Sequence, residues 1–440
     1  MRQAFVFLAH YWKARRRKRW TDRESFDRWR ERRVVRHIEF VRSRSPFYRE
    51  RWNGIPSSSW RTFPPIDKSV MMAHFDRLNT VGITRSEAFA VADAAEASRN
   101  FSPALGGVTV GLSSGTSGNR GLFLVGDRER AAWAGAMLGR LLPGSLLSRR
   151  SIAFFLRANS NLYESVRSKR IVFRFYDLLV PVKDQLAALA EQRPDVIVAP
   201  PSVLRELAEA RLSGRLDVGP SRVVSVAETM DPLDERRIAL AFGSPIHQVY
   251  QCTEGFLACT CRHGTLHLNE DLVYIEKEFV PGRERTFVPI VTDFSRKTQP
   301  IVRYRLNDLL TESDRPCPCG SPFTSLEKIE GRCDDIFYAS SLEPDGEPVT
   351  VYPDFVTRAV LGSSSGIAHY RAIQTAIDAW TIELELRDAT RRSETEQRVG
   401  LSIAALCERL NCRMPALRFA DYSPPRGAVK LRRVERRTPG

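Results

Sequence analysis

The sequence lacks any apolar run of the roughly 18 residues that a helix needs to span a bilayer. The apolar stretch Phe5–Ala9 is too short for the core of a secretory signal, and a basic cluster follows it where a cleavage site would stand. Cysteine is sparse, with 8 among 440 residues. We therefore predict a cytoplasmic protein whose cysteines are reduced or metal-bound rather than paired in disulfides.

The body of the chain carries no net basic charge, although the formal net charge of the whole chain is +15. Residues 1–50 hold sixteen Lys/Arg against six Asp/Glu, residues 425–440 hold six against one, and the residues between them balance. Because nucleic-acid binders carry basic residues across the folded domain, this distribution argues against specific nucleic-acid binding. It predicts solvated basic ends, with weak contact between the N-terminus and a membrane surface as a further possibility.

A Walker A motif is also missing, but a different hydroxyl-rich loop is present. Residues 111–121 read GLSSGTSGNRG between two β-rich runs, 108–110 and 122–125. Glycines allow left-handed backbone, and inward N–H groups, hydroxyls and a guanidinium can together hold phosphate oxygens. Taken alone, such a turn is more often a flexible connector, so the phosphate interpretation depends on partners further along the chain. The candidate phosphate contacts are Ser113, Ser114, Gly115, Thr116, Ser117, Gly118 and Arg120.

The middle of the chain alternates short apolar strands with helices, which predicts a parallel sheet covered by helices on both faces. Ligands bind such sheets beyond the carboxyl ends of their strands. Glu228 follows one expected strand, 222–226, and Thr253 and Glu254 follow the next, 247–250. The other strands that we expect are 151–156 and 195–199, and the expected helices are 127–142, 185–192, 203–211 and 234–242.

The pattern changes near residue 335. A helix is expected over 352–361, a hairpin over 368–386, a helix to 410 and a strand over 417–420. We therefore predict an α/β protein in which a large N-terminal domain with helix-covered sheets precedes a small, mobile α+β C-terminal domain. The predicted domains are a basic helical extension (1–50), the large domain (51–332) and a small lid (333–440).

Four cysteine and histidine side chains form a candidate metal set. Cys261 and His267 stand in one segment, and Cys317 and Cys319 stand in a Cys-Pro-Cys-Gly turn about fifty residues later. Three thiolates and one imidazole suit tetrahedral Zn²⁺ in a structural role. Cys259 and His263 offer substitute ligands, and four reduced thiols near a surface turn are the alternative without metal.

Several polar clusters occur in a particular order. The hydroxyl-rich loop is followed by YQCTEG at 250–255, RYRLND at 303–308, GRCDD at 331–335 and GAVK at 427–430. This order resembles the adenylate-forming (ANL) superfamily of acyl-CoA synthetases, adenylation domains and luciferases. SPFYR at 45–49, together with the Cys/His segments, is most similar to the phenylacetate–CoA ligase branch and its deazaflavin-adenylating relatives. The motifs match best over residues 105–335.

The resemblance implies a role for each cluster. The loop would cradle the ATP phosphates, with Arg120 replacing the lysine of the family. Tyr250 would stack on adenine, with Glu228 at the same nucleotide, Thr253 would contact the α-phosphate, and Glu254 would hold Mg²⁺. Further along, Asp308 would accept the ribose hydroxyls beside Arg332, and Lys430 would reach the reacting carboxylate. The implied catalytic residues are Thr253, Glu254, Arg332 and Lys430.

The implied activity is that of a ligase that converts a carboxylic acid, expected to be aromatic, into an acyl-adenylate with release of pyrophosphate. Three outcomes stay open for the adenylate: transfer to CoA, transfer to the thiol of a carrier protein, or no transfer, with the adenylate itself released or consumed by a partner. Two other interpretations stay open: adenylylation of a phenolic hydroxyl, as in the deazaflavin relatives, and a degenerate ATP-binding scaffold that docks through its basic ends. The expected cofactors are ATP and Mg²⁺, with structural Zn²⁺ and CoA as further candidates.

Overall fold

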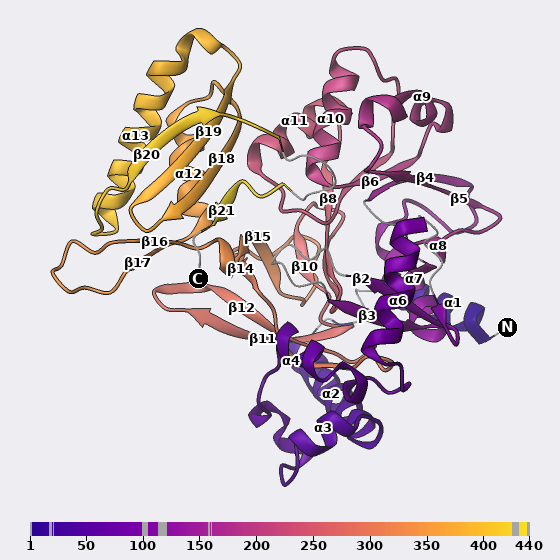
Figure 1. Cartoon of the computed structure of the whole chain (residues 1–440). Helices are drawn as coiled ribbons and strands as arrows, with labels where there is room; N and C mark the ends of the chain where they lie inside the picture. The colour runs from indigo at the N-terminus through magenta and orange to yellow at the C-terminus, as the bar shows by residue number, and fades with distance from the viewer. Residues whose placement is uncertain are drawn as a thin grey trace. The chain divides into compact units, whose positions relative to one another are not determined.

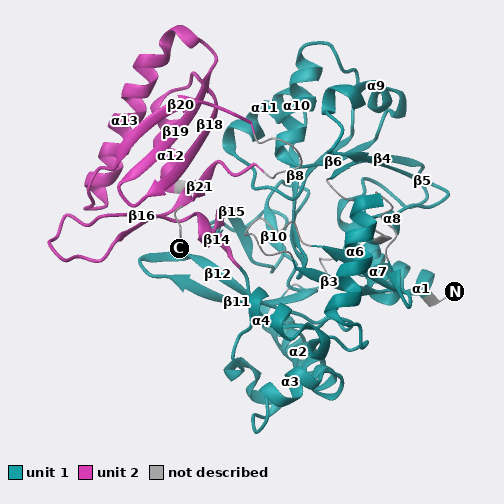
Figure 2. Cartoon of the chain, viewed as in Figure 1, with its two compact units in different colours: residues 1–306, 311–328 teal, residues 307–310, 329–440 magenta. Residues whose placement is uncertain are grey.

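The computed structural model describes residues 2–16, 20, 22–98, 104–112, 121–156, 159, 161–424 and 431–437. The chain divides into two compact units (Figure 2). Unit 1 comprises residues 1–306 and 311–328, and unit 2 comprises 307–310 and 329–440. Both units mix helices and strands, and the first is much the larger, which confirms the predicted fold class.

Unit 1 begins with helices that carry the basic N-terminal sequence. Helix α2 starts after Asp22, whose carboxylate accepts hydrogen bonds from the backbone N–H groups of Glu24 and Ser25. It ends at Arg44, because the next residue, Ser45, precedes Pro46 and is extended. Along α2, residues such as Val34, Ile38 and Val41 are buried at helical spacing. The elements are α1 (Arg2–Arg15), α2 (Arg23–Arg44), α3 (Pro46–Arg51), η2 (Ser57–Thr62), α4 (Lys68–Ala73), α5 (Phe75–Leu78) and α6 (Arg85–Ser98).

The hydroxyl-rich loop joins two strands of a short antiparallel sheet. The sheet has the order β1-β2-β3, and Leu112 at the end of β2 pairs with Leu122 at the start of β3. The strand–loop–strand prediction is therefore confirmed for both flanking strands. The strands are β1 (Ala104–Leu105), β2 (Val108–Leu112) and β3 (Leu122–Gly126).

The parallel part of the large sheet has the order β5-β4-β6-β7-β8, and the helices between its strands lie beside it (Figure 1). Its core buries Phe155, Leu189, Ile197, Leu204 and Ile238. The strands are β4 (Arg150–Leu156), β5 (Ile171–Asp177), β6 (Val196–Ala199), β7 (Arg222–Ser225) and β8 (Ile246–Cys252). The helices are α7 (Asp127–Leu141), α8 (Asn161–Glu164), α9 (Val182–Gln192), α10 (Pro201–Leu212) and α11 (Pro232–Phe242).

The predicted helices and strands of this part are confirmed within a few residues, and β5 is an addition to them. After β8 the sheet becomes antiparallel, because β9 turns back along β8 and β10 turns back along β9. The remaining order is β10-β15-β14-β12-β11, with β13 also paired to β12. These strands are β9 (Gly255–Thr260), β10 (Leu266–Leu268), β11 (Val273–Val280), β12 (Arg283–Asp293), β13 (Ile301–Arg305), β14 (Asp308–Glu312) and β15 (Ser325–Arg332).

Unit 2 contains a four-stranded sheet of order β20-β19-β18-β21 that packs with α12 and α13 around Tyr370, Trp380 and Ile403. The predicted hairpin, two helices and one strand are all present. Its elements are η3 (Cys333–Asp335), β16 (Phe337–Ala339), β17 (Val349–Val351), α12 (Pro353–Ser363), β18 (Ile367–Ala376), β19 (Ala379–Leu386), η4 (Ala389–Arg391), α13 (Arg392–Arg409), β20 (Ala416–Asp421) and β21 (Val434–Arg436).

Among the residues that the structure describes, every helix is too short or too polar to cross a bilayer.

Candidate functional site

Thr253 and Glu254 form the turn between β8 and β9, at the carboxyl end of a parallel strand. The Thr253 hydroxyl donates a hydrogen bond of 2.9 Å to Glu254 Oε2, and only 8% of Glu254 is exposed. Tyr304 on β13 is buried and hydrogen-bonds through its hydroxyl to Glu254. Burial, and after it the charge of the Glu254 carboxylate, raises the pKa of Tyr304. A buried carboxylate oxygen with two hydroxyl neighbours is a hard donor of the kind that Mg²⁺ binds.

Arg296 connects this turn to the strand that leaves the hydroxyl-rich loop. Its guanidinium donates to the backbone oxygen of Thr253 and to that of Leu124 on β3, each at 3.1 Å. Gln299 also holds β3, because its side-chain oxygen accepts from Leu124 N at 2.8 Å and its amide donates to Leu122 O at 3.2 Å. Unit 1 therefore brings one flank of the loop and the Thr253–Glu254 turn together.

The buried acid Asp293 packs against the Thr253–Glu254 turn. Asp293 at the end of β12 is buried, and a Cβ on Gly255 would lie 2.8 Å from its carboxylate, so the turn requires glycine there. Burial raises the pKa of Asp293 to about 6, against hydrogen bonds from Ser295 and the positive charge of Arg296. Arg296 is 9% exposed; its backbone N–H donates to Asp293 O at 3.2 Å, and its guanidinium binds the Glu254 turn and β3. Sequence analysis missed Arg296, Gln299 and Tyr304 as site residues.

The other candidates of unit 1 lie on neighbouring strands. Tyr250 is buried on β8, and the next residue, Gln251, accepts a hydrogen bond of 3.1 Å from the indole N–H of Trp133. Glu228 lies beyond the carboxyl end of β7, where its carboxylate accepts from Ser202 N at 3.2 Å, in the first turn of α10. Glu228 thus serves the helix start, and its role toward a nucleotide stays a prediction.

Asp308 and Arg332 belong to unit 2. Asp308 begins β14 and Arg332 ends β15. Their neighbours meet: the Asn307 side chain donates to the Asp334 carboxylate, and Cys333 N donates to Asn307 O at 3.1 Å. Unit 2 therefore brings the ends of these two predicted motifs together.

The loop residues Ser113, Ser114, Gly115, Thr116, Ser117, Gly118 and Arg120, together with Lys430, lie outside the described residues. Two residues after Lys430, Arg432 forms a two-pronged ion pair with Asp335, a buried residue of the same unit. Burial raises the pKa of Asp335, and the Arg432 hydrogen bond opposes that shift. This pair fixes the segment that follows Lys430 and is a positioning contact that the sequence did not reveal.

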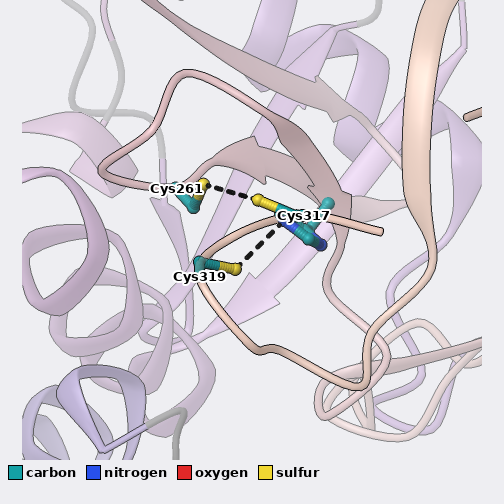
Figure 3. Close-up of side chains that lie close together, drawn as sticks. Cys261, Cys317 and Cys319 are labelled. Carbon is teal, nitrogen blue, oxygen red and sulfur yellow. Dashed lines mark hydrogen bonds between the residues drawn. The ribbon is translucent and has the colours of Figure 1, made fainter. Parts of the chain in front are cut away.

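The predicted metal ligands meet in unit 1. One ligand atom from each of Cys261, His267, Cys317 and Cys319 lies within 4.8 Å of the others. The sulfurs of Cys261 and Cys317 are 3.6 Å apart, and Cys319 Sγ is 3.4 Å from His267 Nε2 (Figure 3). A tetrahedral zinc ion with Zn–S near 2.3 Å and Zn–N near 2.0–2.1 Å gives corresponding separations of about 3.8 and about 3.6 Å. The donor set and its spacing therefore fit zinc.

A contact around the metal set fixes the histidine. His267 Nδ1 donates to the backbone oxygen of Phe323 at 3.1 Å, which leaves Nε2 to face the sulfurs. The substitute ligands lie elsewhere: Cys259 is fully buried beside Asn269, and His263 accepts a hydrogen bond from Arg262. The structure thus selects Cys261 over Cys259 and His267 over His263.

A surface pocket of about 520 Å³ opens in unit 2 beside Tyr338, Gln374 and Arg436. The predicted site residues are all absent from its described lining.

No protein-family model matches the sequence, and no curated protein matches it. Solved structures do match. The structure of 2-hydroxyisobutyryl-CoA ligase in the postadenylation state with 2-HIB-AMP has 19% identity, covers 92% of this chain and 88% of that chain, and gives a TM-score of 0.67. The amide bond synthetase McbA from Marinactinospora thermotolerans has 15% identity over 72% of this chain and 66% of that one, with a TM-score of 0.52. The anthranilate CoA ligase AuaEII with anthranoyl-AMP has 12% identity, 73% and 65% coverage and a TM-score of 0.51.

At these identities a structural match establishes architecture. The chain therefore has the fold of the adenylate-forming ligases, with a large first domain and a smaller second one.

Proposed function

We propose that this protein is a ligase that activates a carboxylic acid with ATP, forming an acyl-adenylate and releasing pyrophosphate. In this reaction a carboxylate oxygen bonds to the α-phosphorus while the bond to the pyrophosphate oxygen breaks. The observation that most strongly supports this proposal is the Arg296 bridge, which holds β3, the strand after the hydroxyl-rich loop, beside the Thr253–Glu254 turn. A phosphate-binding loop and a magnesium ligand must be close neighbours in such an enzyme, because the metal and the loop share the same phosphates.

The roles within the proposed site follow from residue chemistry. Glu254 would hold Mg²⁺, which neutralises phosphate charge when bound, and Thr253 would donate to the α-phosphate. Tyr304 orients the Glu254 carboxylate through its hydroxyl. We assign the ribose contacts to Asp308 and Arg332 and the reacting carboxylate to Lys430. Tyr250, Glu228 and Arg120 complete the proposed nucleotide contacts.

We propose an aromatic acid as substrate and CoA as acceptor, with a carrier-protein thiol as the alternative acceptor. The aromatic assignment rests on the similarity to the phenylacetate–CoA ligase branch. One structurally similar ligase is bound to anthranoyl-AMP, which agrees with an aromatic acid. Another similar ligase is bound to 2-HIB-AMP, whose acyl group is not aromatic. CoA appears together with 2-HIB-AMP in a further structure of that ligase. A cytoplasmic location stays a prediction.

A structural zinc ion belongs to the same proposal. Bound by Cys261, His267, Cys317 and Cys319, it would tie the β9–β10 turn to the segment before β15. All four ligand positions come from protein side chains, so the ion would have no open position for substrate and would serve stability rather than catalysis.

The test is ATP–pyrophosphate exchange with the full-length protein over a panel of aryl and short aliphatic acids. We expect exchange that depends on both Mg²⁺ and an acid. Replacement of Glu254 by Gln removes one anionic metal ligand and should slow exchange at least about 100-fold, whereas the exposed Glu284→Gln serves as the matched control. Lys430→Ala should slow exchange by orders of magnitude while ATP binding is retained.

Tyr304→Phe gives a finer test. It removes only the hydroxyl at Glu254, so exchange should fall by about 10- to 100-fold, the value of a hydrogen bond to a charged group, while folding is preserved. Exchange with phenols but not acids would favour adenylylation of a hydroxyl. ATP binding without exchange on any substrate would favour the degenerate scaffold.

A further inference from the structure

Helix α1 carries an apolar stripe that faces solvent. Phe5, Leu8 and Trp12 are 75%, 45% and 55% exposed, and their spacing of three and four residues places them on one side of the helix. The opposite side is the one that packs: Tyr11 and Ala14 are almost fully buried. An exposed stripe of three large apolar residues on a single short helix is costly in water and marks an interaction surface.

The orientation of this stripe is fixed, because α1 packs closely on α7 (Figure 1). A Cβ on Gly135 would lie 2.2 Å from the backbone oxygen of Phe7, and one on Gly139 would lie 2.6 Å from that of Tyr11. Two glycines four residues apart thus let the helix backbones touch. At the end of α1, Arg15 donates to the Tyr11 hydroxyl at 2.9 Å. The stripe therefore belongs to the folded body of unit 1.

Positive charge lies at the C-terminal end of the stripe. Lys13 and Arg16 are exposed at the end of α1, and the sequence continues with three further basic residues, 17–19. On α2, Arg33 is the cation that lies close enough to act on α1, through His10. Arg28, Arg32 and Arg36 are also exposed on α2, and Arg28 is ion-paired with Glu24 at 3.3 Å.

The electrostatics of His10 support this picture. Burial lowers its pKa to about 4, and the charges of Lys13, Arg33 and Arg128, which come from three different helices, act in the same direction. Asp271 acts in the opposite direction, but this acid is ion-paired with Arg140. The cations of α1, α2 and α7 thus lie close enough to act on one group.

We propose that α1 docks this protein on a membrane surface that carries anionic lipid headgroups, with Phe5, Leu8 and Trp12 entering the interface and the flanking cations contacting the headgroups. At 14 residues the helix is about 21 Å long, too short to span a bilayer, so it lies in the plane of the surface. Nucleic acid would use the cations but not the apolar stripe. A second copy would bring like charges together, which disfavours self-association through this face.

This inference goes beyond the proposed function, since it concerns where the enzyme acts and not its chemistry. The experiment is cosedimentation of the full-length protein with vesicles of phosphatidylcholine alone and of phosphatidylcholine with one quarter phosphatidylserine. We expect binding to the anionic vesicles that weakens with added salt. The combined variant Phe5→Ser, Leu8→Ser, Trp12→Ser should bind at least about tenfold more weakly.

Two further variants separate the contributions. Lys13→Glu with Arg16→Glu keeps the stripe but reverses two charges, and should weaken binding by at least about 25-fold, since each basic residue near an anionic surface contributes about fivefold. Leu240→Ser with Leu401→Ser removes two leucines that are 68% and 65% exposed on other helices and should bind as the wild type does. Melting curves show whether each variant is folded.

Three outcomes overturn the proposal. The first is absence of binding to anionic vesicles by the folded wild-type protein. The second is binding that the Phe5/Leu8/Trp12 variant retains in full. The third is a wild-type protein that binds no vesicles but forms a concentration-dependent dimer or binds mixed-sequence RNA, when the Phe5/Leu8/Trp12 variant loses that dimer or that RNA binding. Pyrophosphate exchange in solution is measured separately, so its failure would not decide the membrane result.

Discussion

Replacement of Glu270 by Gln should destabilise unit 1 by about 3 kcal/mol. The Glu270 side chain is 3% exposed and forms ion pairs with Arg30, which is 8% exposed, and with Arg23. Its carboxylate also accepts from Thr324 N at 2.7 Å. Burial alone would raise the pKa of Glu270, but the hydrogen bonds and charges of the two arginines hold it below its usual range. The acid is therefore a buried anion that depends on its partners.

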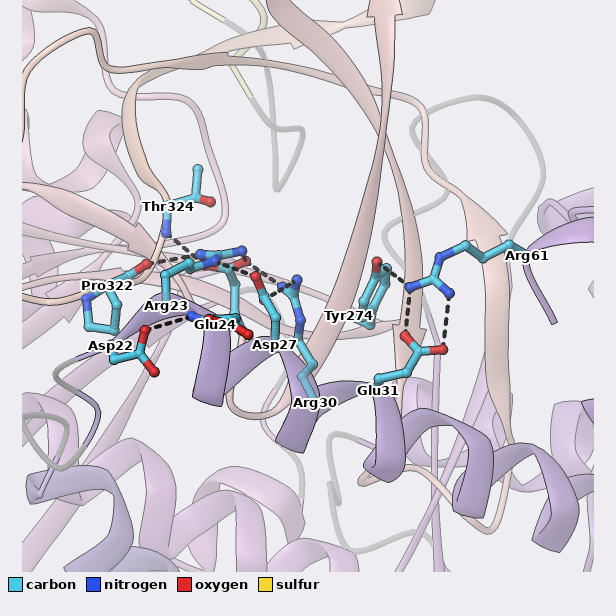
Figure 4. Close-up of polar contacts among 11 residues, drawn as sticks. Asp22, Arg23, Glu24, Asp27, Arg30, Glu31, Arg61, Tyr274, Pro322 and Thr324 are labelled. Carbon is cyan, nitrogen blue, oxygen red and sulfur yellow. Dashed lines mark hydrogen bonds and ion pairs between the residues drawn. The ribbon is translucent and has the colours of Figure 1, made fainter. Parts of the chain in front are cut away.

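The size of this destabilisation depends on which ion pairs Arg30 and Arg23 retain when Glu270 loses its charge. Removing one member of a buried ion pair costs about 3–5 kcal/mol, because the other charge stays buried. Arg30 retains an ion pair of 2.8 Å with Asp27, which places the estimate at the lower end (Figure 4). Arg23 is 42% exposed, so Arg23→Ala should cost less than about 1 kcal/mol. Arg30→Met combined with Glu270→Leu should cost less than Glu270→Gln alone, since no charge is left unpaired.

The assay is urea unfolding of the full-length protein followed by tryptophan fluorescence. Trp20 and Trp29 contact Phe26 on the same helix as Arg23 and Arg30, so they report on this region. The exposed Glu284→Gln is the matched control for charge loss. A Glu270→Gln transition within about 0.5 kcal/mol of that control, at an unchanged slope, would refute the reasoning that the buried pair needs its anion.

Three further predictions test other parts of the molecule. Cys319→Ser removes one proposed zinc ligand and should lower both the zinc content and, by several degrees, the melting temperature, whereas Cys333→Ser outside the metal set should change neither, as metal analysis and thermal unfolding would show. Burial, and after it the charges of Lys297 and Arg33, lowers the pKa of His37 to about 3. Below about pH 6.5 the unfolded chain therefore binds a proton that the folded chain does not, and the free energy of unfolding should fall by up to about 1.4 kcal/mol per pH unit. His37→Phe should remove that part of the pH dependence of acid unfolding. Arg432→Ala leaves the Asp335 carboxylate buried without its ion pair, and should lower the stability of unit 2 by about 3 kcal/mol in denaturant unfolding.

The sequence by itself determined the local elements, because these depend on the spacing of neighbouring residues. Apolar runs such as 151–156 and 195–199 predicted β4 and β6, and the paired strands around the hydroxyl-rich loop followed from alternation over 108–110 and 122–125. The edge strand β5 escaped notice, because only every second residue is well buried at its start and Arg174 interrupts the apolar pattern.

Tertiary structure decided which distant side chains are partners. Candidate metal ligands could be guessed from residue type, but the choice of Cys261 over Cys259 required the end of β9: Cys259 lies within the strand and is buried beside Asn269, whereas Cys261 lies just beyond it, in the turn toward β10. Arg296 resembles any surface arginine in the sequence, and only the packing of β3 against the Glu254 turn gives it two backbone oxygens to bind. Local spacing is encoded along the chain, whereas burial and partners arise only when segments far apart in the sequence meet.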